Sequence, residues 1–476
     1  MVTHPIGRVS GPRLARLLEG WHGAGRPSSA ALAGAIRLLV LDGRLPPGTA
    51  LPAEREVAAA LRVSRTLVAT AWDALRADGL VRTRRGAGTW TALPGPGRAQ
   101  DNPGDQPLDL ARAASAALPA VAHAVDAVRG ALTAELAGHG YHDYGIDLLR
   151  ERLADRYTAR GLPTTADQIL VTNGAHHALA LVLRTFTGPG DRVLVDQPTY
   201  PNAIDAITAA HAIPVPVPLL DDGWDFDGVA AALRQSGPRL AYLIVDFHNP
   251  TGLLLDADGR GRLAALAARA RTPLVVDETI AELDLRAAPE PVAPLSGPGT
   301  VITIGSASKS HWGGLRLGWV RADADVVRRL ASARHAFDLG SPVFEQLVLA
   351  ELYADPVPAI AERRADLARR RDVLVAAVRE HLPDWSFRVP DGGLGLWCAL
   401  PGPMASRLAL AARAVGVRVA PGSRFSPHGG LERWLRLPYT LPEPLLVEAV
   451  RRLSPAAASV TGSLGSDGTD GLIPVA

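Results

Sequence analysis

One lysine stands out in this chain because arginine supplies every other side-chain positive charge. Lys309 is the single lysine among 50 lysine and arginine residues. A lysine amine can lose its proton and attack a carbonyl carbon, whereas an arginine guanidinium stays charged. Lys309 follows the apolar run Val301–Ile304, has Ser306 three residues before it, and precedes Arg316. A surface lysine is the usual alternative, but surface cations here are arginines, so we expect a Schiff-base lysine beside a phosphate pocket.

Other polar residues follow apolar runs in the same way. Asp277 directly follows Leu274–Val276, and its carboxylate could pair with a pyridinium nitrogen. Asn249 follows Leu240–Val245 and could donate a hydrogen bond to the phenolic oxygen of such a ring. Tyr200, in Asp-Gln-Pro-Thr-Tyr-Pro, could stack on the ring face. A cap, a turn and core packing are the ordinary alternatives for these three residues taken singly.

A possible phosphate site lies between a predicted strand and a predicted helix. Gly174, Ala175 and His176 begin that helix. Backbone N–H groups at the start of a helix lack intrahelical partners and attract anions. These three residues therefore predict a phosphate site, although a tight bend at Gly174 is the simpler alternative.

The elements that must position these residues alternate between strand and helix. Each expected strand is short, apolar and rich in Val or Ile, which is typical of buried parallel strands joined by helices. The runs are Ile169–Thr172, Arg192–Val195, Leu240–Val245, Leu274–Val276 and Val301–Ile304. The pattern predicts an α/β fold with a mostly parallel sheet flanked by helices. It also predicts a helical segment at residues 343–378 and a smaller α+β lobe at 387–453.

The N-terminal part differs sharply in charge from the rest. Residues 1–98 hold 14 arginines and six acids, a net charge of +8, which leaves −6 on the remainder. Between Ser29 and Thr91 we predict three helices and a two-stranded wing, with Arg65 and Thr66 at the exposed start of the helix that enters a major groove. The predicted contacts to double-stranded DNA are Arg55, Ser64, Arg65, Thr66, Arg85 and Gly86. A helical subdomain with a solvated arginine face is the alternative.

Composition breaks set the predicted boundaries. We expect a winged helix-turn-helix at residues 28–93, a linker at 94–107, a body at 108–455 and a disordered tail at 456–476. No apolar run approaches the roughly 18 residues of a membrane span, and no signal peptide is suggested. The single cysteine, Cys398, excludes an internal disulfide framework and a multi-thiolate metal site, and no metal is expected.

Two parts of the chain resemble known families. The string GRLPPGTALPAEREVAAALRVSRTLVATAWDALRADGLVRTRRGAGTW, which begins at Gly43, resembles the winged helix-turn-helix of GntR-type bacterial regulators almost end to end. Leu67 departs from the polar residue that many relatives have there, so the operator sequence does not carry over. From about residue 110 to 455, the segments around the strand ends resemble fold-type-I pyridoxal-phosphate enzymes of the aspartate-aminotransferase kind.

The second resemblance implies roles for individual residues. Lys309 would form the internal aldimine with pyridoxal 5'-phosphate, and Ser306 and Arg316 would hold its phosphate. Tyr141 would reach the phosphate in the neighbouring subunit, which implies a homodimer with shared sites. Arg436, in Trp-Leu-Arg-Leu-Pro, would bind the α-carboxylate of an amino acid, a task that suits a bidentate guanidinium.

The main departure from the enzymes follows Asp277. Relatives often have a tyrosine two or three residues after this aspartate, supporting the phenolic oxygen of the cofactor. Here those positions hold Thr279 and Ile280. The change predicts altered cofactor electronics and argues against full transaminase activity.

A GntR-type head joined by a linker to an aminotransferase-like body is the architecture of the MocR-type transcriptional regulators, which this chain resembles over nearly its whole length. The resemblance implies a cytoplasmic, nucleoid-associated homodimer that binds DNA and senses an amino compound through aldimine exchange at Lys309. Two alternatives remain. One is an aminotransferase with an appended DNA-binding module, and the other is a DNA-binding protein whose body has lost the cofactor and serves only for dimerisation.

Overall fold

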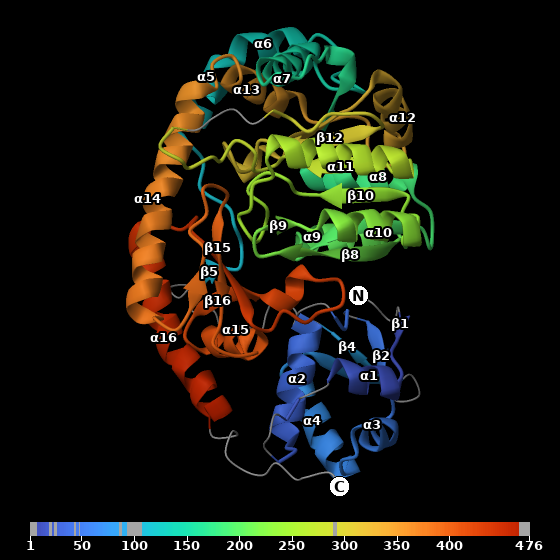
Figure 1. The fold of residues 1–476 in the computed structure, drawn as a ribbon, viewed down its shortest axis with the longest axis vertical. Helices are drawn as coiled ribbons and strands as arrows, with labels where there is room; N and C mark the ends of the chain where they lie inside the picture. The colour runs from blue at the N-terminus through green and yellow to red at the C-terminus, as the bar shows by residue number, and fades with distance from the viewer. Residues whose placement is uncertain are drawn as a thin grey trace. The chain divides into compact units, whose positions relative to one another are not determined.

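The computed structural model describes residues 7–18, 21–22, 26–41, 44–46, 48–84, 88–92, 107–288 and 293–465. The chain divides into two compact units (Figure 1). The first consists of residues 1–108, 401–418 and 452–476, and the second of residues 109–400 and 419–451. The lobe near the C-terminus therefore contributes residues to both units.

The N-terminal unit contains the expected winged helix-turn-helix. Its elements are α2 (Ser29–Leu41), β2 (Thr49–Leu51), α3 (Glu54–Leu61), α4 (Arg65–Ala77), β3 (Val81–Arg84) and β4 (Gly88–Thr91). Ser64 is the N-cap of α4, and its hydroxyl accepts the Leu67 N–H at 3.1 Å. Leu51 ends β2, which pairs antiparallel with β4. A strand there is consistent with proline at 52, which delays the helix to Glu54.

Residues 7–18 also belong to this unit, although the sequence prediction began the domain at residue 28. Strand β1 (Gly7–Arg8) pairs in parallel with β2, which gives a sheet of order β1-β2-β4-β3. Helix α1 (Gly11–Leu17) follows it. Val9, Leu14 and Leu18 are buried in the same apolar cluster as Trp72. This segment was missed because it is short and carries only one helical turn of periodic apolar residues.

The second unit is built on an eight-stranded sheet of order β6-β13-β12-β11-β10-β7-β8-β9. Its strands are β6 (Ile169–Thr172), β7 (Arg192–Gln197), β8 (Ile213–Leu220), β9 (Gly223–Trp224), β10 (Leu240–Leu243), β11 (Leu274–Asp277), β12 (Val301–Ser306) and β13 (Gly318–Arg321). The four central strands β12, β11, β10 and β7 are mutually parallel. The predicted α/β fold and all five predicted strands are therefore confirmed.

Helices lie on both faces of this sheet (Figure 1). The helices of this part of the chain are α5 (Pro119–Ala127), α6 (Arg129–Glu135), α7 (Asp147–Ala159), α8 (Ala175–Phe186), α9 (Pro201–Ala209), α10 (Phe226–Ser236), α11 (Ala257–Ala270), α12 (Ala324–Arg334), α13 (Val343–Leu352) and α14 (Val357–His381). Ile169 and Val171 of β6 pack in one apolar cluster with α5, α7 and α13. Leu170, between them, is also fully buried, as expected for a strand covered on both faces.

A smaller sheet has the order β14-β15-β17-β16-β5. Its strands are β5 (Leu108–Leu110), β14 (Ser386–Phe387), β15 (Gly395–Ala399), β16 (Val417–Pro421) and β17 (Trp434–Pro438). Two further helices are α15 (Ala405–Ala414) and α16 (Glu443–Gly465). The last helix corrects the predicted tail, because residues 456–465 are helical and Ala456, Ala457 and Val460 are buried. Residues 466–476, and residues 93–106 of the predicted linker region, lie outside the described residues.

Across the described ranges, no helix is both long enough and apolar enough to cross a membrane. In the same ranges no group of three or more His, Cys, Asp or Glu residues could hold a metal ion.

Candidate functional site

The predicted site residues of the second unit come together at one edge of the large sheet. Tyr200, Asn249, Asp277 and Lys309 follow or end β7, β10, β11 and β12, which are neighbouring parallel strands. The carboxyl ends of parallel strands meet at the same edge, where loops can carry ligand-binding groups. Four chain segments that are distant in sequence therefore supply one site.

Asp277 is buried at the end of β11, 9% exposed, and is held by two donors. The Tyr242 hydroxyl donates to Oδ2 at 2.6 Å, and the Thr279 N–H donates to Oδ1 at 2.9 Å. Together they fix the orientation of the carboxylate. Tyr242, which lies inside the expected strand β10, was not predicted from the sequence. Its one signal was an isolated polar atom in an otherwise apolar strand, since a buried hydroxyl needs a partner.

Thr279 and Ile280 occupy the two positions at which the resemblance to the enzymes predicts a tyrosine. Ile280 is 7% exposed and brings no polar atom to the site. The Thr279 hydroxyl is buried without a hydrogen-bond partner among the described residues. Thr279 instead contributes its backbone N–H to Asp277.

The Lys309 amine lies in an environment that favours its uncharged form. Burial, and then the positive charge of Arg436, lower the pKa of Lys309 to about 8. Asp277 opposes this shift. The Nζ atom donates a hydrogen bond to the carbonyl oxygen of Ala113 at 2.7 Å. The amine is still mostly protonated at neutral pH, but a minority of it is uncharged, and the uncharged form is the one that attacks a carbonyl carbon.

Arg436 lies on β17, 8% exposed, beside the same edge. Its Nη1 donates to Asn249 Oδ1 at 3.1 Å, and its Nη2 donates to the carbonyl of Ala111. Its Nε is a buried donor without a partner in the described part of the chain. Burial lowers the pKa of Arg436 to about 10, so the guanidinium is still charged at neutral pH. A buried, charged guanidinium with a spare donor suits a carboxylate ligand.

The segment of residues 109–116, which we call the strap, lies across these groups. Its carbonyls at Ala111, Ala113 and Ala116 accept hydrogen bonds from Arg436, Lys309 and Arg363. Asp109 Oδ1 accepts the N–H groups of residues 111 and 112 at 2.9 and 3.0 Å, which closes a turn at the start of the strap. Arg363 also donates to the carbonyls of residues 310 and 311, beside the lysine. The strap was not predicted from the sequence, because backbone carbonyls leave no trace in residue types.

Tyr200 lies next to Asp277 and Arg436. Burial, and then the negative charge of Asp277, raise the pKa of Tyr200, so its hydroxyl remains protonated. That hydroxyl accepts a hydrogen bond from Asn202 Nδ2 at 2.9 Å. The ring is therefore held as a neutral aromatic surface, consistent with the predicted stacking role.

A cradle for an anion forms where α8 begins. Gly174, at φ 89°, is its N-cap, and a Cβ added there would lie 3.0 Å from Arg316 Nη2. Arg316 donates to the carbonyl of residue 173 at 3.4 Å. Ala175 and His176 are the first residues of α8, where backbone N–H groups lack intrahelical partners, and the exposed Arg316 guanidinium lies beside Gly174. Helix N–H groups and a guanidinium together suit a phosphate. The His176 side chain is exposed and brings no additional contact.

Ser306 lies at the end of β12, close to this cradle in the fold. Its hydroxyl is within 2.9 Å of the Ser308 hydroxyl and 3.1 Å of the Leu317 carbonyl. Gly318, on the neighbouring strand, lies close to the start of α8, because a Cβ there would come within 2.6 Å of the Ala175 nitrogen. The strand that carries Ser306 and the cradle are therefore held together by backbone packing.

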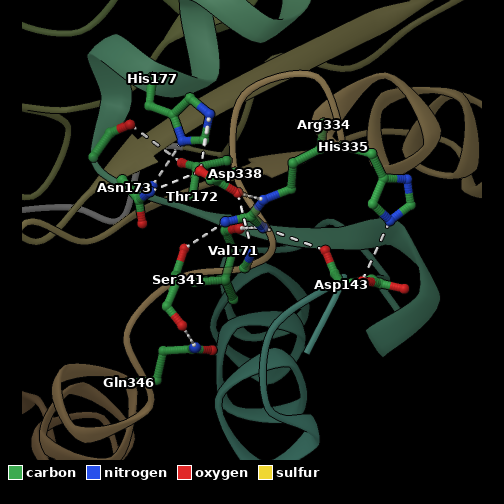
Figure 2. A network of polar contacts seen from close by, with 12 residues as sticks. Asp143, Val171, Thr172, Asn173, His177, Arg334, His335, Asp338, Ser341 and Gln346 are labelled. Carbon is green, nitrogen blue, oxygen red and sulfur yellow. Dashed lines mark hydrogen bonds and ion pairs between the residues drawn. The ribbon is translucent and has the colours of Figure 1, made fainter. Parts of the chain in front are cut away.

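Figure 2 shows a polar network around Asn173, the residue that precedes the cradle. Asn173 Nδ2 donates to Asp338 Oδ2 at 2.8 Å, and the Asn173 N–H donates to His177 Nδ1 at 3.1 Å. Arg334, 1% exposed, donates to Asp338, to the Ser341 hydroxyl at 2.9 Å and to the carbonyl of residue 171 at 2.7 Å. Burial lowers the pKa of His177, so the imidazole stays neutral and can accept through Nδ1. The network fixes the turn that precedes the cradle.

Tyr141 does not join the site residues of its own chain at the edge of the large sheet. Its side chain is 61% exposed, and its ring packs against His139 at 5.7 Å between ring centroids. The role predicted for it in a neighbouring subunit therefore stays a prediction.

The predicted DNA-contact residues lie on the surface of the N-terminal unit. Arg55, Arg65 and Thr66 are exposed at the starts of α3 and α4. Arg65 Nε forms an ion pair with Glu54 at 3.3 Å, and its side chain is 74% exposed. Ser64 is engaged as the cap of α4. Arg85 and Gly86 lie outside the described residues.

The residues of the second unit fit pyridoxal phosphate. A partly uncharged lysine, a buried carboxylate and a neutral tyrosine ring converge at one edge. The cradle at Gly174 is lined by Arg316 and by helix N–H groups. The lysine would hold the aldehyde carbon, the aspartate the ring nitrogen and the cradle the phosphate.

Both parts of the chain match families of known proteins. Residues 106–453 match the family described as aminotransferase class I and II, and residues 28–90 match the bacterial regulatory proteins of the gntR family. The chain belongs to the aminotransferase class I and II family. With the gntR-family domain ahead of it, its architecture is that of the MocR-type regulators, and its body is a pyridoxal-phosphate-binding domain.

Two regulators and one solved aminotransferase structure are among the relatives of this MocR-type chain. The uncharacterized HTH-type transcriptional regulator YdfD of Bacillus subtilis is 26% identical over 85% of this chain and 90% of its own. The probable rhizopine catabolism regulatory protein MocR of Rhizobium meliloti is 28% identical over 82% of this chain and 85% of its own. The solved structure of LysN, an α-aminoadipate aminotransferase of Thermus thermophilus complexed with N-(5'-phosphopyridoxyl)-L-leucine, has a TM-score of 0.69 at 27% identity and covers 75% of this chain and 94% of its own.

Proposed function

We propose that this regulator senses an amino compound that carries a carboxylate and transmits its binding to the DNA-binding unit through the strap. The observation that carries the proposal is that Arg436 and Lys309 both bond the strap, at Ala111 and Ala113. One is the predicted carboxylate ligand and the other the predicted cofactor lysine. The strap begins where the predicted linker from the DNA-binding domain ends.

Lys309 and Arg436, the two residues that an effector would engage, each donate a hydrogen bond to a carbonyl of the strap. Bound pyridoxal phosphate supplies an aldehyde that reacts reversibly with primary amines. An effector's amine would replace that of Lys309, which frees the lysine to hold the carbonyl of Ala113. An effector's carboxylate would compete with the carbonyl of Ala111 for Arg436. A ligand shifts a conformational equilibrium only through different affinities for the two states, and these exchanges provide such a difference.

The remaining predicted roles follow from the same interpretation. Ser306, Arg316 and the cradle at Gly174 would hold the phosphate, with Asp277 at the ring nitrogen and Asn249 at the phenolic oxygen. We propose a homodimer in which Tyr141 completes the partner's phosphate site, and its exposure leaves it available for that contact. The regulator would act on operator DNA in the bacterial cytoplasm.

A second candidate function is an aminotransferase with an appended DNA-binding domain. The observation that favours it is that the residues of an aminotransferase site converge here and that the fold matches solved aminotransferases. Ile280 and Thr279 weigh against it, because the hydroxyl that supports the cofactor's phenolic oxygen in relatives is missing from Ile280 and is not a phenol at Thr279.

The deciding experiment titrates single amino acids into the protein loaded with pyridoxal phosphate. The visible absorbance spectrum and the affinity for DNA from the chain's own promoter are both recorded. We expect at least one amino acid that changes both, and Arg436→Gln should abolish the response to it. Spectral change with no change in DNA affinity, accompanied by keto-acid turnover at ordinary enzyme rates, would instead establish the enzyme.

The strap is tested separately by Asp109→Ala, which removes the side chain that closes its first turn. We expect the variant without effector to shift toward the DNA affinity of the effector-bound protein, with a smaller response on adding effector. Asp126→Ala, at an exposed position on α5, is the matched control. An unchanged effector response in Asp109→Ala would contradict transmission through the strap.

A further inference from the structure

The N-terminal segment of residues 7–18 is folded as part of the DNA-binding unit, although the gntR-family match begins only at residue 28. The Val9 N–H donates to the Ala50 carbonyl at 3.0 Å, which extends the pairing of β1 with β2. Val9, Leu14 and Leu18 are at most 3% exposed. Burying three such side chains against the domain stabilises the segment in one position.

Its helix is attached beside the predicted DNA contacts of α3. The Gly11 N–H donates to Glu56 Oε1 at 2.7 Å. A Cβ added at Gly11 would come within 2.9 Å of Glu56 Cγ, so the two helix starts are in contact. Arg55, next to Glu56 in the first turn of α3, is exposed and is a predicted contact to DNA. The start of α1 therefore lies beside the predicted interface.

The segment presents only positive charge on its described surface. Arg8, Arg13 and Arg16 are exposed and form no ion pair within the described residues. Arg13 and Arg16 are three residues apart on α1, so they lie on one face, while Leu14 and Leu18 face inward. Glu54 of α3 pairs with Arg65, while Glu56 keeps its negative charge where it accepts the Gly11 N–H, so the three arginines outnumber the one carboxylate that contacts the segment.

We propose that Arg8, Arg13 and Arg16 bind the phosphate backbone of the same DNA duplex that α4 contacts. The charge complementarity and the continuity with Arg55 point to DNA rather than to a protein partner. The inference rests on the DNA-binding function and enlarges its interface beyond the helix-turn-helix. Phosphate contacts position a protein on the duplex without reading its sequence.

The test measures how DNA affinity depends on salt, with the full chain loaded with pyridoxal phosphate. The triple variant Arg8→Ala, Arg13→Ala and Arg16→Ala is compared with the wild type on two probes, a duplex from the chain's own promoter and a duplex of random sequence. Each lost phosphate contact lowers the slope of log affinity against log salt by about 0.9. We expect a decrease of between about one and three in that slope and at least a tenfold loss of affinity at low salt.

A matched control removes the same charge elsewhere. Arg234, Arg269 and Arg388 are exposed residues of the second unit, and their triple alanine variant should keep the wild-type slope. An equal decrease in both triple variants would reflect net charge alone and would overturn the proposal. A slope unchanged in the N-terminal variant would overturn it as well.

The two probes separate a phosphate contact from a structural effect on the domain. Loss of phosphate contacts weakens binding to both duplexes by the same factor, which leaves their affinity ratio unchanged. If the N-terminal variant instead loses mainly the preference for the promoter duplex, the segment supports α4 indirectly and the proposal is wrong. A wild-type protein that binds neither duplex would contradict the DNA-binding function itself, which distinguishes that failure from this one.

Discussion

The DNA-binding unit and the cofactor-binding unit place their predicted functional residues by opposite means. In the first, Arg65 and Thr66 are consecutive residues at the start of one helix, exposed to solvent and positioned by the cap at Ser64. In the second, Asp277 and Lys309 are buried or half-buried and meet only because parallel strands end at one edge. A local segment thus suffices to present a surface to DNA, whereas the cofactor site requires the whole sheet.

This contrast predicts that substitutions in the two units have different consequences. An exposed side chain contributes little to stability, so its loss affects mainly binding. A buried polar group is bound to several others, so its loss also disturbs the groups that it holds. The strap follows the predicted linker along the chain, and buried side chains of the cofactor-binding unit donate to its backbone carbonyls.

The largest effect is expected for Lys309→Ala. The chain has no second lysine to replace it, so the visible absorbance band of the lysine-bound cofactor should disappear completely. No amino compound should then change DNA affinity, while binding to DNA itself persists. The measurement is an absorbance spectrum after soaking with pyridoxal phosphate, followed by a DNA titration. A band that survives the substitution would show that the cofactor is bound through another group.

Arg65→Ala should weaken DNA binding by about 1–3 kcal/mol, roughly five- to 150-fold in Kd. The exposed guanidinium is at the start of the helix expected in the major groove, and its ion pair with Glu54 is an exposed one of small energy. The cofactor spectrum should not change. Fluorescence anisotropy with labelled promoter DNA measures the loss, with Arg234→Ala as the control. An unaltered Kd would place the interface on another face of the unit.

Asn173→Ala should weaken cofactor binding by about 1–1.5 kcal/mol, close to tenfold in Kd. The substitution removes the hydrogen bond from Asn173 to Asp338 but leaves the Arg334–Asp338 ion pair in place, so no buried charge is stranded. A titration with pyridoxal phosphate, followed by absorbance, gives the change. Asn202→Ala, which removes a donor to Tyr200 and leaves the Asn173–Asp338 contact intact, should have a smaller effect on the Kd for pyridoxal phosphate.

The smallest effect is a shift in pH dependence. Because the uncharged amine reacts, the rate of cofactor uptake should rise with pH and level off above a pKa of about 8 for Lys309. Arg436→Gln removes a positive neighbour that lowers this pKa, so the plateau should move to higher pH, by about one unit or less. Arg112 has the smallest effect among the positive charges that lower the pKa of Lys309, so Arg112→Gln should move the plateau less than Arg436→Gln does. A plateau near 10.5 in the wild type would contradict the proposed environment of the lysine.

The sequence predicted the helices and strands better than it predicted which side chains form hydrogen bonds with one another. The five strands, the helix that begins at Arg65 and the convergence of Asp277, Asn249 and Lys309 follow from apolar runs and from polar residues placed after them. Tyr242 was not predicted, because its position in an apolar strand resembles core packing until the neighbouring strand brings Asp277 to its hydroxyl. The network around Asp338 was missed for the same reason, since Asn173 and Asp338 are separated by 165 residues.

The sequence by itself determined what is local: a single reactive amine, a charged head, the periodicity of the helices and strands, and the caps that begin them. Only the tertiary structure decided which backbone groups those side chains bind. Lys309 and Arg436 meet the carbonyls of Ala113 and Ala111, and residues 7–18 join the DNA-binding unit through Val9, Leu14 and the contact of Gly11 with Glu56. The physical reason is that every residue has the same carbonyl and nearly every residue the same N–H group, so residue types carry no information about backbone contacts between distant segments.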